Sequence, residues 1–320
     1  MLKMRKNSQI MITGGLGFVG SNLAKTLLES GYKNVTLLSR SKSKIRNIDQ
    51  IADQVEVIID NAKNIRKYIA NIDVIFHLAS TVDNYAVQEG EPHRDSEINV
   101  LLTSYLLDAI RNVKPDIRLV FGSSFFAVGN PESCPVDETV CCRPISLYGA
   151  TRLCGEHLMY AYREAFHLNA VVIRLTNVYG PYERSASVRK AAFNYFIIKA
   201  LCNETITMYG AGKIKRDLIF VSDATKAIVK VAEKGTEPLY FIGSGKPRSL
   251  KEAFESIVEV VGSGNIKQIP TPEFHQKVGT GDFWVDNKKI RALGWNEEVD
   301  LLQGIRMTAD YYLANPEFLE

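Results

Sequence analysis

The residues best suited to chemistry are a tyrosine and an arginine four positions apart. Tyr148 and Arg152 fall near the start of a predicted helix over 147–167, so their side chains project from one face. A phenol ionises only at about pH 10 in water, and a neighbouring cation stabilises the phenolate. Ser124 follows a predicted strand over 118–121, where its hydroxyl can orient a substrate oxygen. This pattern predicts proton exchange by Tyr148 beside a cofactor that transfers hydride.

The cofactor site is predicted by three glycines that follow a short apolar strand. Gly14, Gly17 and Gly20 are spaced three apart, immediately before and within a predicted helix over 18–30. The spacing allows a tight turn and a close backbone approach at one helix N-terminus, where N–H groups and the helix dipole bind a pyrophosphate. Phe18 and Val19, which begin the helix, belong to the same predicted site. The chain is therefore expected to bind a dinucleotide.

The kind of dinucleotide is indicated at the end of the second predicted strand, over 35–38. NAD-binding chains usually carry Asp or Glu there, which accepts hydrogen bonds from the ribose. This chain has Ser39 and Arg40, and a hydroxyl with a guanidinium suits the 2′-phosphate of NADP. We predict that NADP(H) is preferred and that NAD(H) is possible. A solvated basic loop is the alternative interpretation.

Composition limits the class of protein. The chain has 320 residues, 46% of them hydrophobic, and a net charge of +3, which is too mild to indicate a nucleic-acid partner. No apolar run approaches the length of a signal peptide core or a membrane span. The five cysteines and five histidines show no metal-ligand spacing, so no metal is predicted. These features favour a cytoplasmic protein that does not bind membranes.

The elements that position the candidate residues alternate along the first half of the chain. Further strands are expected over 55–59, 73–78 and 170–175, with another helix over 97–113. This order predicts an α/β fold, a doubly wound parallel-sheet Rossmann domain with a smaller mixed α/β C-terminal substrate lobe. The expected Rossmann domain covers 1–176 plus about 214–241, and the lobe covers about 177–213 and 242–320.

Several motifs, in order, resemble those of the extended short-chain dehydrogenase/reductases of the NAD-dependent epimerase/dehydratase family, which modify nucleotide sugars. The matching stretches run nearly from end to end of the chain. They are 13–20, 76–79, Asn99, 122–124, 136–138, 148–152, 174–181, 216–223 and 293–295.

The resemblance implies roles for individual positions. Tyr148 would exchange a proton with the sugar oxygen, Ser124 would hydrogen-bond that oxygen, and Arg152 would orient the cofactor and the tyrosine. Among cofactor contacts, Asp60 would meet adenine, with Asn61 beside it and with Leu78 and Ala79 at a neighbouring strand end. Asn177 would contact the sugar, and Arg216 would grip the diphosphate. The alternative for Arg216 is a surface ion pair with Asp217.

Departures from the family pattern carry as much information as the matches. Arg152 replaces the usual lysine; it remains a permanent cation but cannot release a proton. Phe125 and Phe126 stand where 4,6-dehydratases have an acid–base pair, which excludes dehydration. Phe125, with Tyr182-Glu183, also removes the residues needed for C3/C5 epimerisation. Gly279 replaces an arginine of the family pattern before Gly281-Asp282, with Lys277 as the nearest cation.

Our leading hypothesis is an NADPH-dependent reductase of a 4-keto nucleotide sugar, with hydride transfer to C4 and Tyr148 as the proton donor. One alternative is an NAD(P)-dependent nucleotide-sugar 4-epimerase. Another is a catalytically weakened NADP-binding homologue, because Arg152 replaces lysine. The resemblance also implies a homodimer that pairs through the helices over 97–113 and 147–167. The residues that suit this interface are Leu101, Leu102, Tyr105, Leu153 and Tyr160.

Overall fold

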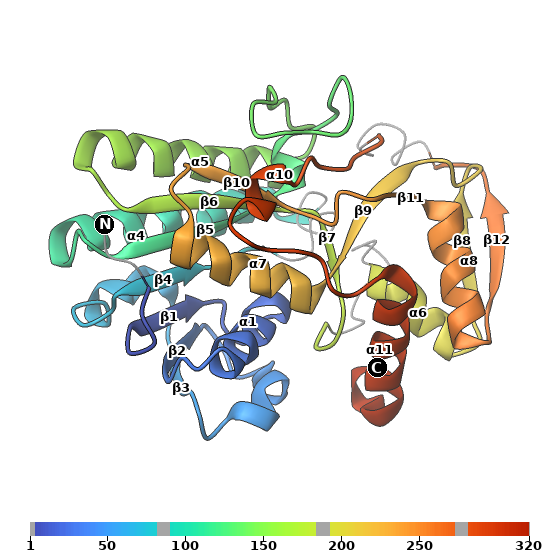
Figure 1. The fold of residues 1–320 in the computed structure, drawn as a ribbon, viewed down its shortest axis with the longest axis horizontal. Helices are drawn as coiled ribbons and strands as arrows, with labels where there is room; N and C mark the ends of the chain where they lie inside the picture. Colours follow the sequence, from blue (N-terminus) through green and yellow to red (C-terminus); the bar gives the residue numbers. More distant parts are fainter. Residues whose placement is uncertain (1–3, 82–89, 184–192, 273–280, 320) are drawn as a thin grey trace.

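Seven parallel strands form the central sheet of the computed structural model, which describes residues 4–81, 90–183, 193–272 and 281–319. Their order is β10-β6-β5-β4-β1-β2-β3 (Figure 1). The strands run parallel, and the order in which the chain adds them reverses between β1 and β4. The strands are β1 (Gln9–Thr13), β2 (Asn34–Ser39), β3 (Glu56–Ile59), β4 (Val74–His77), β5 (Arg118–Ser124), β6 (Ala170–Leu175) and β10 (Leu239–Ile242). In such a sheet, ligands bind at the carboxyl ends of the strands beside the reversal.

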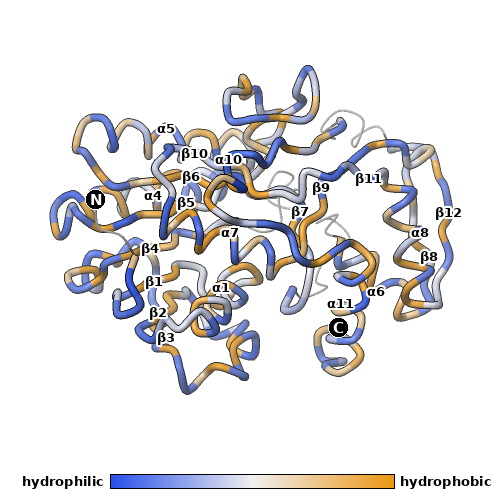
Figure 2. The backbone as a smooth tube through the Cα atoms, viewed as in Figure 1, coloured by the Kyte–Doolittle hydropathy of each residue, from blue (hydrophilic) through white to orange (hydrophobic). Residues whose placement is uncertain are grey.

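Helices cover both faces of this sheet. On one face, α1 (Phe18–Glu29) and α7 (Val221–Lys234) bury Leu23, Leu27 and Ile228 in a shared core. On the other, α4 (Leu102–Val113) and α5 (Leu147–Phe166) cover the sheet with an apolar cluster that includes Leu106 and Met159. The strands between these layers are mostly hydrophobic along their length (Figure 2). The predicted doubly wound α/β fold is confirmed.

A smaller lobe lies to the right of the sheet in Figure 1. Its core is formed by α6 (Phe193–Leu201), α8 (Leu250–Val261) and α11 (Leu301–Ala314), packed beside the parallel pair of β8 (Thr205–Tyr209) and β12 (Asn265–Ile269). Between this lobe and the central sheet, β11 (Pro247–Ser249), β9 (Lys215–Phe220) and β7 (Asn177–Tyr179) form a three-stranded sheet.

The path of the chain between the two parts is more complex than a single crossing. The segment over about 214–241 was predicted to return to the first domain. Of its elements, α7 and β10 pack with the central sheet, whereas β9 joins the three-stranded sheet. Near the C-terminus, Ile290 of α10 (Lys288–Arg291) and Trp295 pack into the core beneath the central sheet. The domain boundaries themselves stay a prediction. No helix within the described ranges has the length and apolar character needed to cross a membrane.

Two predicted elements differ from the observed ones in ways that shape the site. The helix expected over 97–113 begins earlier, as the short α3 (His93–Asp95), passes through a π-helical turn η3 (Ser96–Leu101) and continues as α4. Strand β5 extends three residues beyond its predicted end, because Gly122, Ser123 and Ser124 pair with β6. Ser124 is therefore the last residue of the strand.

Candidate active site

The glycine-rich turn between β1 and α1 forms a cradle that side chains would fill. Gly14 has φ +71°, and a Cβ there would lie 2.9 Å from the backbone nitrogen of Ala79. A Cβ at Gly20 would collide with the carbonyl oxygen of Gly14. Gly17 caps α1 without a side-chain hydrogen bond, so the N–H groups at the start of the helix, at Phe18 and Val19, remain available to an anion.

Backbone hydrogen bonds bring the neighbouring strand ends to this turn. The Gly14 N–H donates to the Leu38 carbonyl at 2.9 Å, and the Leu78 N–H donates to Thr13 at 3.1 Å. The Asp60 N–H donates to the Ser39 carbonyl at 3.0 Å. The cofactor residues predicted at the ends of β1, β2, β3 and β4 therefore lie along one edge of the sheet, and they fit a dinucleotide.

The adenosine end of this edge is partly exposed. Arg40 is exposed, and its side chain has no hydrogen-bond or ion-pair partner among the described residues. Ser39 Oγ lies 3.1 Å from the Ser41 carbonyl. Hydrogen bonds from Tyr68 (2.7 Å), from Asn64 (2.8 Å) and from the Asn61 N–H (2.7 Å) hold the Asp60 carboxylate and lower its pKa to about 2. Asp60 is therefore ionised at neutral pH.

Ser124 and Tyr148, which carry the predicted catalytic hydroxyls, both lie against Phe126, where β5 ends and α5 begins. Ser124 Oγ accepts from the Phe126 N–H at 3.4 Å, and the Tyr148 ring lies edge-on to Phe126 with centroids 6.0 Å apart. The Ser146 hydroxyl caps α5 by accepting from the Gly149 N–H at 3.1 Å. A Cβ at Gly149 would collide with the Phe126 carbonyl, so this glycine lets the helix begin directly against the turn after Ser124.

Arg152 lies one helical turn beyond Tyr148, on the buried side of α5. It is 1% exposed, and its guanidinium stands 4.5 Å from the centroid of Phe121. Nη1 makes two long contacts of 3.5 Å, to Ser80 Oγ and to Asn99 Oδ1, and Nε has no partner among the described residues. A buried cation with unused donors is suited to hold the hydroxyls of a bound cofactor.

Asn99 is a site residue to which sequence reasoning assigned no role. It is fully buried in the π-helical turn, where its amide nitrogen donates to Thr81 Oγ1 (3.1 Å) and to Thr151 Oγ1 (3.0 Å). Asn99 thus ties η3 to α5 beside Arg152. No sequence pattern distinguishes such a turn from an ordinary α-helix, although π-helical turns often occur at functional sites.

Two further polar groups lie beneath the site. His77, at the end of β4, is buried, and its Nδ1 lies 2.8 Å from Thr13 Oγ1. Burial, together with the charge of Arg152, lowers the pKa of His77 to about 3, so the ring stays neutral. Glu156, two helical turns beyond Tyr148, forms a buried ion pair with Arg174 at 2.6 Å.

The predicted substrate residues lie on the adjoining three-stranded sheet. Asn177 begins β7, just past the end of β6, and its amide donates to the Asp217 carbonyl at 3.2 Å. Arg216 on β9 donates to the carbonyls of Lys215 (3.0 Å) and Gly281. The alternative surface ion pair with Asp217 does not form, because the carboxylate of Asp217 is fully buried among backbone and hydroxyl donors. Lys277 and Gly279 lie outside the described residues.

The positions after Ser124 are apolar, as expected. Phe125 is 3% exposed and packs against Phe283, with ring centroids 4.9 Å apart. The ring of Phe126 lies tilted against that of Phe125, with centroids 4.4 Å apart. Neither position can supply an acid or a base.

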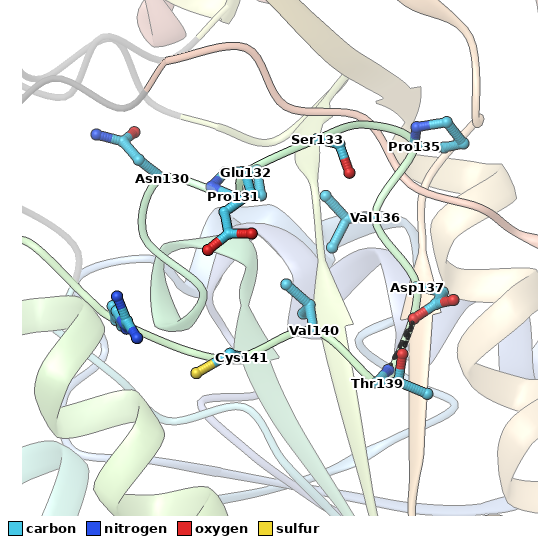
Figure 3. Close-up of a pocket in the computed structure, with 11 residues that line it drawn as sticks. Asn130, Pro131, Glu132, Ser133, Pro135, Val136, Asp137, Thr139, Val140 and Cys141 are labelled. Atoms are coloured by element: carbon cyan, nitrogen blue, oxygen red, sulfur yellow. Dashed lines mark hydrogen bonds between the residues drawn. The ribbon is translucent and has the colours of Figure 1, made fainter.

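A pocket of about 370 Å³ opens on the loop that leads from β5 to α5 (Figure 3). Asp137 turns toward Thr139 within it, and Cys141 lines one side. Ser124, Tyr148 and Arg152 do not line this pocket, which is therefore separate from the candidate active site. In the described part of the chain, no group of three His, Cys, Asp or Glu residues is placed to hold a metal.

Comparisons with known proteins identify the family of the chain. The model of the NAD dependent epimerase/dehydratase family matches residues 10–243. A putative UDP-glucose 4-epimerase of Methanocaldococcus jannaschii is 31% identical over 312 residues, which cover 96% of this chain and 99% of that protein.

Solved structures are similar over the same extent. The UDP-glucose 4-epimerase of Thermotoga maritima with UDP-glucose has a TM-score of 0.87 at 25% identity, covering 96% of this chain and 99% of the other. The UDP-glucose 4-epimerase of Thermus thermophilus in complex with NAD has a TM-score of 0.83 at 26% identity, with the same two coverages of 96% and 99%.

Proposed function

The chain belongs to the NAD-dependent epimerase/dehydratase family, as its motifs predicted, and within that family we propose that it epimerises a nucleotide sugar at C4. The observation that supports this most is that Ser124 and Tyr148 both lie against Phe126, where β5 meets α5, with Arg152 one helical turn further along, over Phe121. Similarity along the whole chain to proteins described as UDP-glucose 4-epimerases supports the same reaction. The epimerase therefore takes first place over the reductase that the sequence favoured.

The chain's own residues divide the work of this reaction. Tyr148 moves a proton to and from the C4 oxygen of the sugar, and Ser124 holds the same oxygen by a hydrogen bond. Arg152 supplies a permanent positive charge beside the phenol and donors for the cofactor. When bound, the dinucleotide supplies the hydride acceptor and donor. Asn177 and Arg216 are proposed to contact the sugar and the diphosphate.

The two phenylalanines after Ser124 limit the class of reaction that the proposed site could catalyse. Elimination of water between C5 and C6 needs an acid and a base beside that bond, and Phe125 and Phe126 provide neither. The proposed chemistry is therefore confined to oxidation and reduction at one carbon of the sugar.

The proposal is tested by incubating the protein with UDP-glucose and NAD and following the formation of the C4 epimer by proton NMR. We expect turnover without net change in NADH, and at least a hundredfold slower turnover for Tyr148→Phe. Tyr105→Phe, an exposed tyrosine on α4, is the matched control and should keep the wild-type rate. Equal rates for Tyr148→Phe and the wild type would refute the assignment.

A second candidate, an NADPH-dependent reductase of a 4-keto nucleotide sugar, is favoured by Ser39 and Arg40. An exposed guanidinium without a partner among the described residues, at the end of β2, suits the 2′-phosphate of NADP. Calorimetric binding of NADP(H) and NAD(H) tests this preference, with Arg40→Asp as the variant. Lys33→Asp, at the opposite end of β2, is the control. Stoichiometric consumption of NADPH with a 4-keto sugar nucleotide would replace the epimerase by the reductase.

The catalytically weakened homologue makes a different prediction. It would bind a dinucleotide tightly and turn over no sugar nucleotide, and Arg152→Lys would not restore activity. Measurable turnover by the wild type would eliminate this hypothesis.

We also propose that the protein forms a homodimer through α4 and α5. Leu101 and Tyr105 are 48% and 47% exposed, although both are large and apolar, and Leu147 at the start of α5 is 41% exposed. Exposed apolar side chains on adjacent helices are typical of a surface that pairs with another chain. Light scattering on the eluting protein would give the mass of the assembly.

A further inference from the structure

A fully buried carboxylate lies where the three-stranded sheet meets the central sheet. Asp217, on β9, has no exposed surface, although it directly follows Arg216, which is proposed to contact the diphosphate. Burial of a carboxylate is costly unless its oxygens are hydrogen-bonded. The hydrogen-bond donors around Asp217 therefore identify the segments that it holds together.

The two carboxylate oxygens of Asp217 accept hydrogen bonds from several parts of the chain. Oδ1 accepts from the Ser244 N–H at 2.7 Å, from the Ser244 hydroxyl at 2.8 Å and from the Thr176 hydroxyl at 3.4 Å. Oδ2 accepts from the N–H groups of Gly245 at 3.1 Å and Val285 at 3.2 Å. Because a backbone N–H can only donate, the side chain must accept at both oxygens.

These donors belong to segments that are distant in sequence. Thr176 directly follows β6 and residues 243–245 directly follow β10, and these are neighbouring strands of the central sheet. Val285 lies in the C-terminal segment that runs beside β9. Asp217 itself belongs to the three-stranded sheet, which shares no strand with the central one. Its carboxylate therefore joins the two sheets.

The segment that follows β10 is held by a second side chain as well. The Asn287 amide donates to the carbonyls of Gly243 at 3.2 Å and Ser244 at 2.8 Å. A Cβ at Gly243 would lie 2.7 Å from Asp217 Oδ2, so the absence of a side chain there allows the carboxylate to lie this close. The junction is therefore tightly packed as well as hydrogen-bonded.

Residues proposed to act on the substrate lie beside this junction. Ser124 pairs with Leu175, the last residue of β6. Asn177 lies two residues further along, and its amide donates to the backbone carbonyl of Asp217 at 3.2 Å. Arg216 immediately precedes Asp217 on β9. The contacts of Asp217 thus link the proposed diphosphate contact to the strand end beside Ser124.

We propose that Asp217 is a positioning residue whose carboxylate fixes β9, and with it Arg216, relative to the ends of β6 and β10. A substrate held by Arg216 at its diphosphate then presents its sugar to Ser124, and this inference rests on the proposed function. Both carboxylate oxygens are used within the protein, so Asp217 acts through its neighbours. Holding the two contacts at a fixed separation favours the reactive geometry, and a misplacement of about 1 Å can cost about a hundredfold in rate.

The substitution Asp217→Asn tests this role. An amide nitrogen cannot accept from a backbone N–H, so the variant loses part of the junction. We expect the kcat for UDP-glucose to fall at least tenfold, whereas the Kd for UDP and the Kd for NAD, measured by calorimetry, should change less than threefold. A kcat within twofold of the wild type would overturn the proposal. An equal loss of UDP binding and kcat would also overturn it, because the damage would then extend to nucleotide binding.

Asp223→Asn is the matched control. Asp223 is a buried carboxylate in the first turn of α7, where it accepts from the N–H groups of Glu298 at 3.0 Å and Val299 at 2.9 Å. The control loses the same kind of hydrogen bond away from the junction, so its Tm should fall while its kcat stays within twofold of the wild type. A tenfold lower kcat in this control would assign the effect to general destabilisation and overturn the proposal.

A milder variant keeps the test decisive if Asp217→Asn does not fold. The double substitution Thr176→Val with Ser244→Ala removes both hydroxyl donors and leaves the carboxylate with its three N–H donors. We expect at least a threefold lower kcat with unchanged affinity for UDP. An unchanged kcat would contradict the positioning role.

Amide hydrogen exchange decides the role of the carboxylate without any turnover. In Asp217→Asn, or in the double variant, residues 215–218, 243–246 and 285–287 should exchange faster than in Asp223→Asn. Equal exchange in these segments would overturn the proposal. If the wild type does not turn over UDP-glucose, the proposed function fails, whereas the exchange rates still show whether Asp217 holds the two sheets together.

Discussion

The stability of the protein should fall as the pH drops below about 6.5, because the fold cannot accommodate a protonated His77. The ring is buried at the end of β4 and lies against Phe121, with ring centroids 5.8 Å apart. Its Nε2 has no hydrogen-bond partner among the described residues, and Arg152 adds a positive charge nearby. Each of these features opposes the imidazolium form.

The size of the effect follows from the two pKa values. The pKa of His77 is about 3 in the folded protein and about 6.5 in the unfolded chain. Between these values the unfolded state binds one more proton, so stability is fully present above pH 6.5 and is lost as the pH falls. At pH 5 this single group removes about 2 kcal/mol from the free energy of unfolding.

Urea unfolding of the wild type and of His77→Gln at pH 7.5 and pH 5 measures this contribution. The variant lacks the titrating group, so its unfolding free energy should decrease by about 2 kcal/mol less between the two pH values. His167→Asn, at an exposed C-cap with φ 55°, is the control and should follow the wild type. If the wild type and His77→Gln lose stability in parallel, His77 is not held neutral and the reasoning is refuted.

Three further predictions address the cradle, the buried ion pair and the assembly. Gly20→Ala places a Cβ against the carbonyl oxygen of Gly14, so calorimetry should show at least tenfold weaker dinucleotide binding. Glu156→Gln leaves Arg174 without its charged partner, and chemical unfolding should show a loss of about 3–5 kcal/mol. Tyr105→Glu puts a charge on the exposed apolar face of α4, and light scattering should show a shift from dimer to monomer.

Much of the fold could be predicted because its strands are short apolar runs that end in small or polar residues. The extension of β5 through Gly122, Ser123 and Ser124 could not, since these residues have little preference for a strand. They are extended because β6 lies alongside and pairs with them. Likewise, β9 has the sequence of a buried strand, but which sheet it joins depends on β7 and β11, which are distant in sequence.

Some residues of the candidate site were also predictable from the sequence, and others were not. Tyr148 and Arg152 were predictable from helical spacing, and the glycine cradle was predictable from its pattern. The role of Asn99 was not, because no sequence pattern distinguishes its π-helical turn from an ordinary α-helix. Only the hydrogen bonds of its buried amide to Thr81 and Thr151 show that it ties this turn to α5.

The two ends of the proposed cofactor site differ in how their charges are arranged, and this difference separates selectivity from chemistry. At the adenosine end, Arg40 is exposed and carries a charge that solvent screens, so it can choose between dinucleotides without affecting the reacting atoms. At the end proposed for the nicotinamide, Arg152 is buried, where the low dielectric makes a charge act more strongly than at the surface. In the proposed function, Arg152 in place of the lysine that the family usually has would change the electrostatics of proton transfer, whereas Ser39 and Arg40 would change which cofactor is held. The departure at Arg152 thus concerns catalysis in the proposed function, and the departure at Ser39 and Arg40 concerns cofactor selection. The presence of one therefore gives no information about the effect of the other.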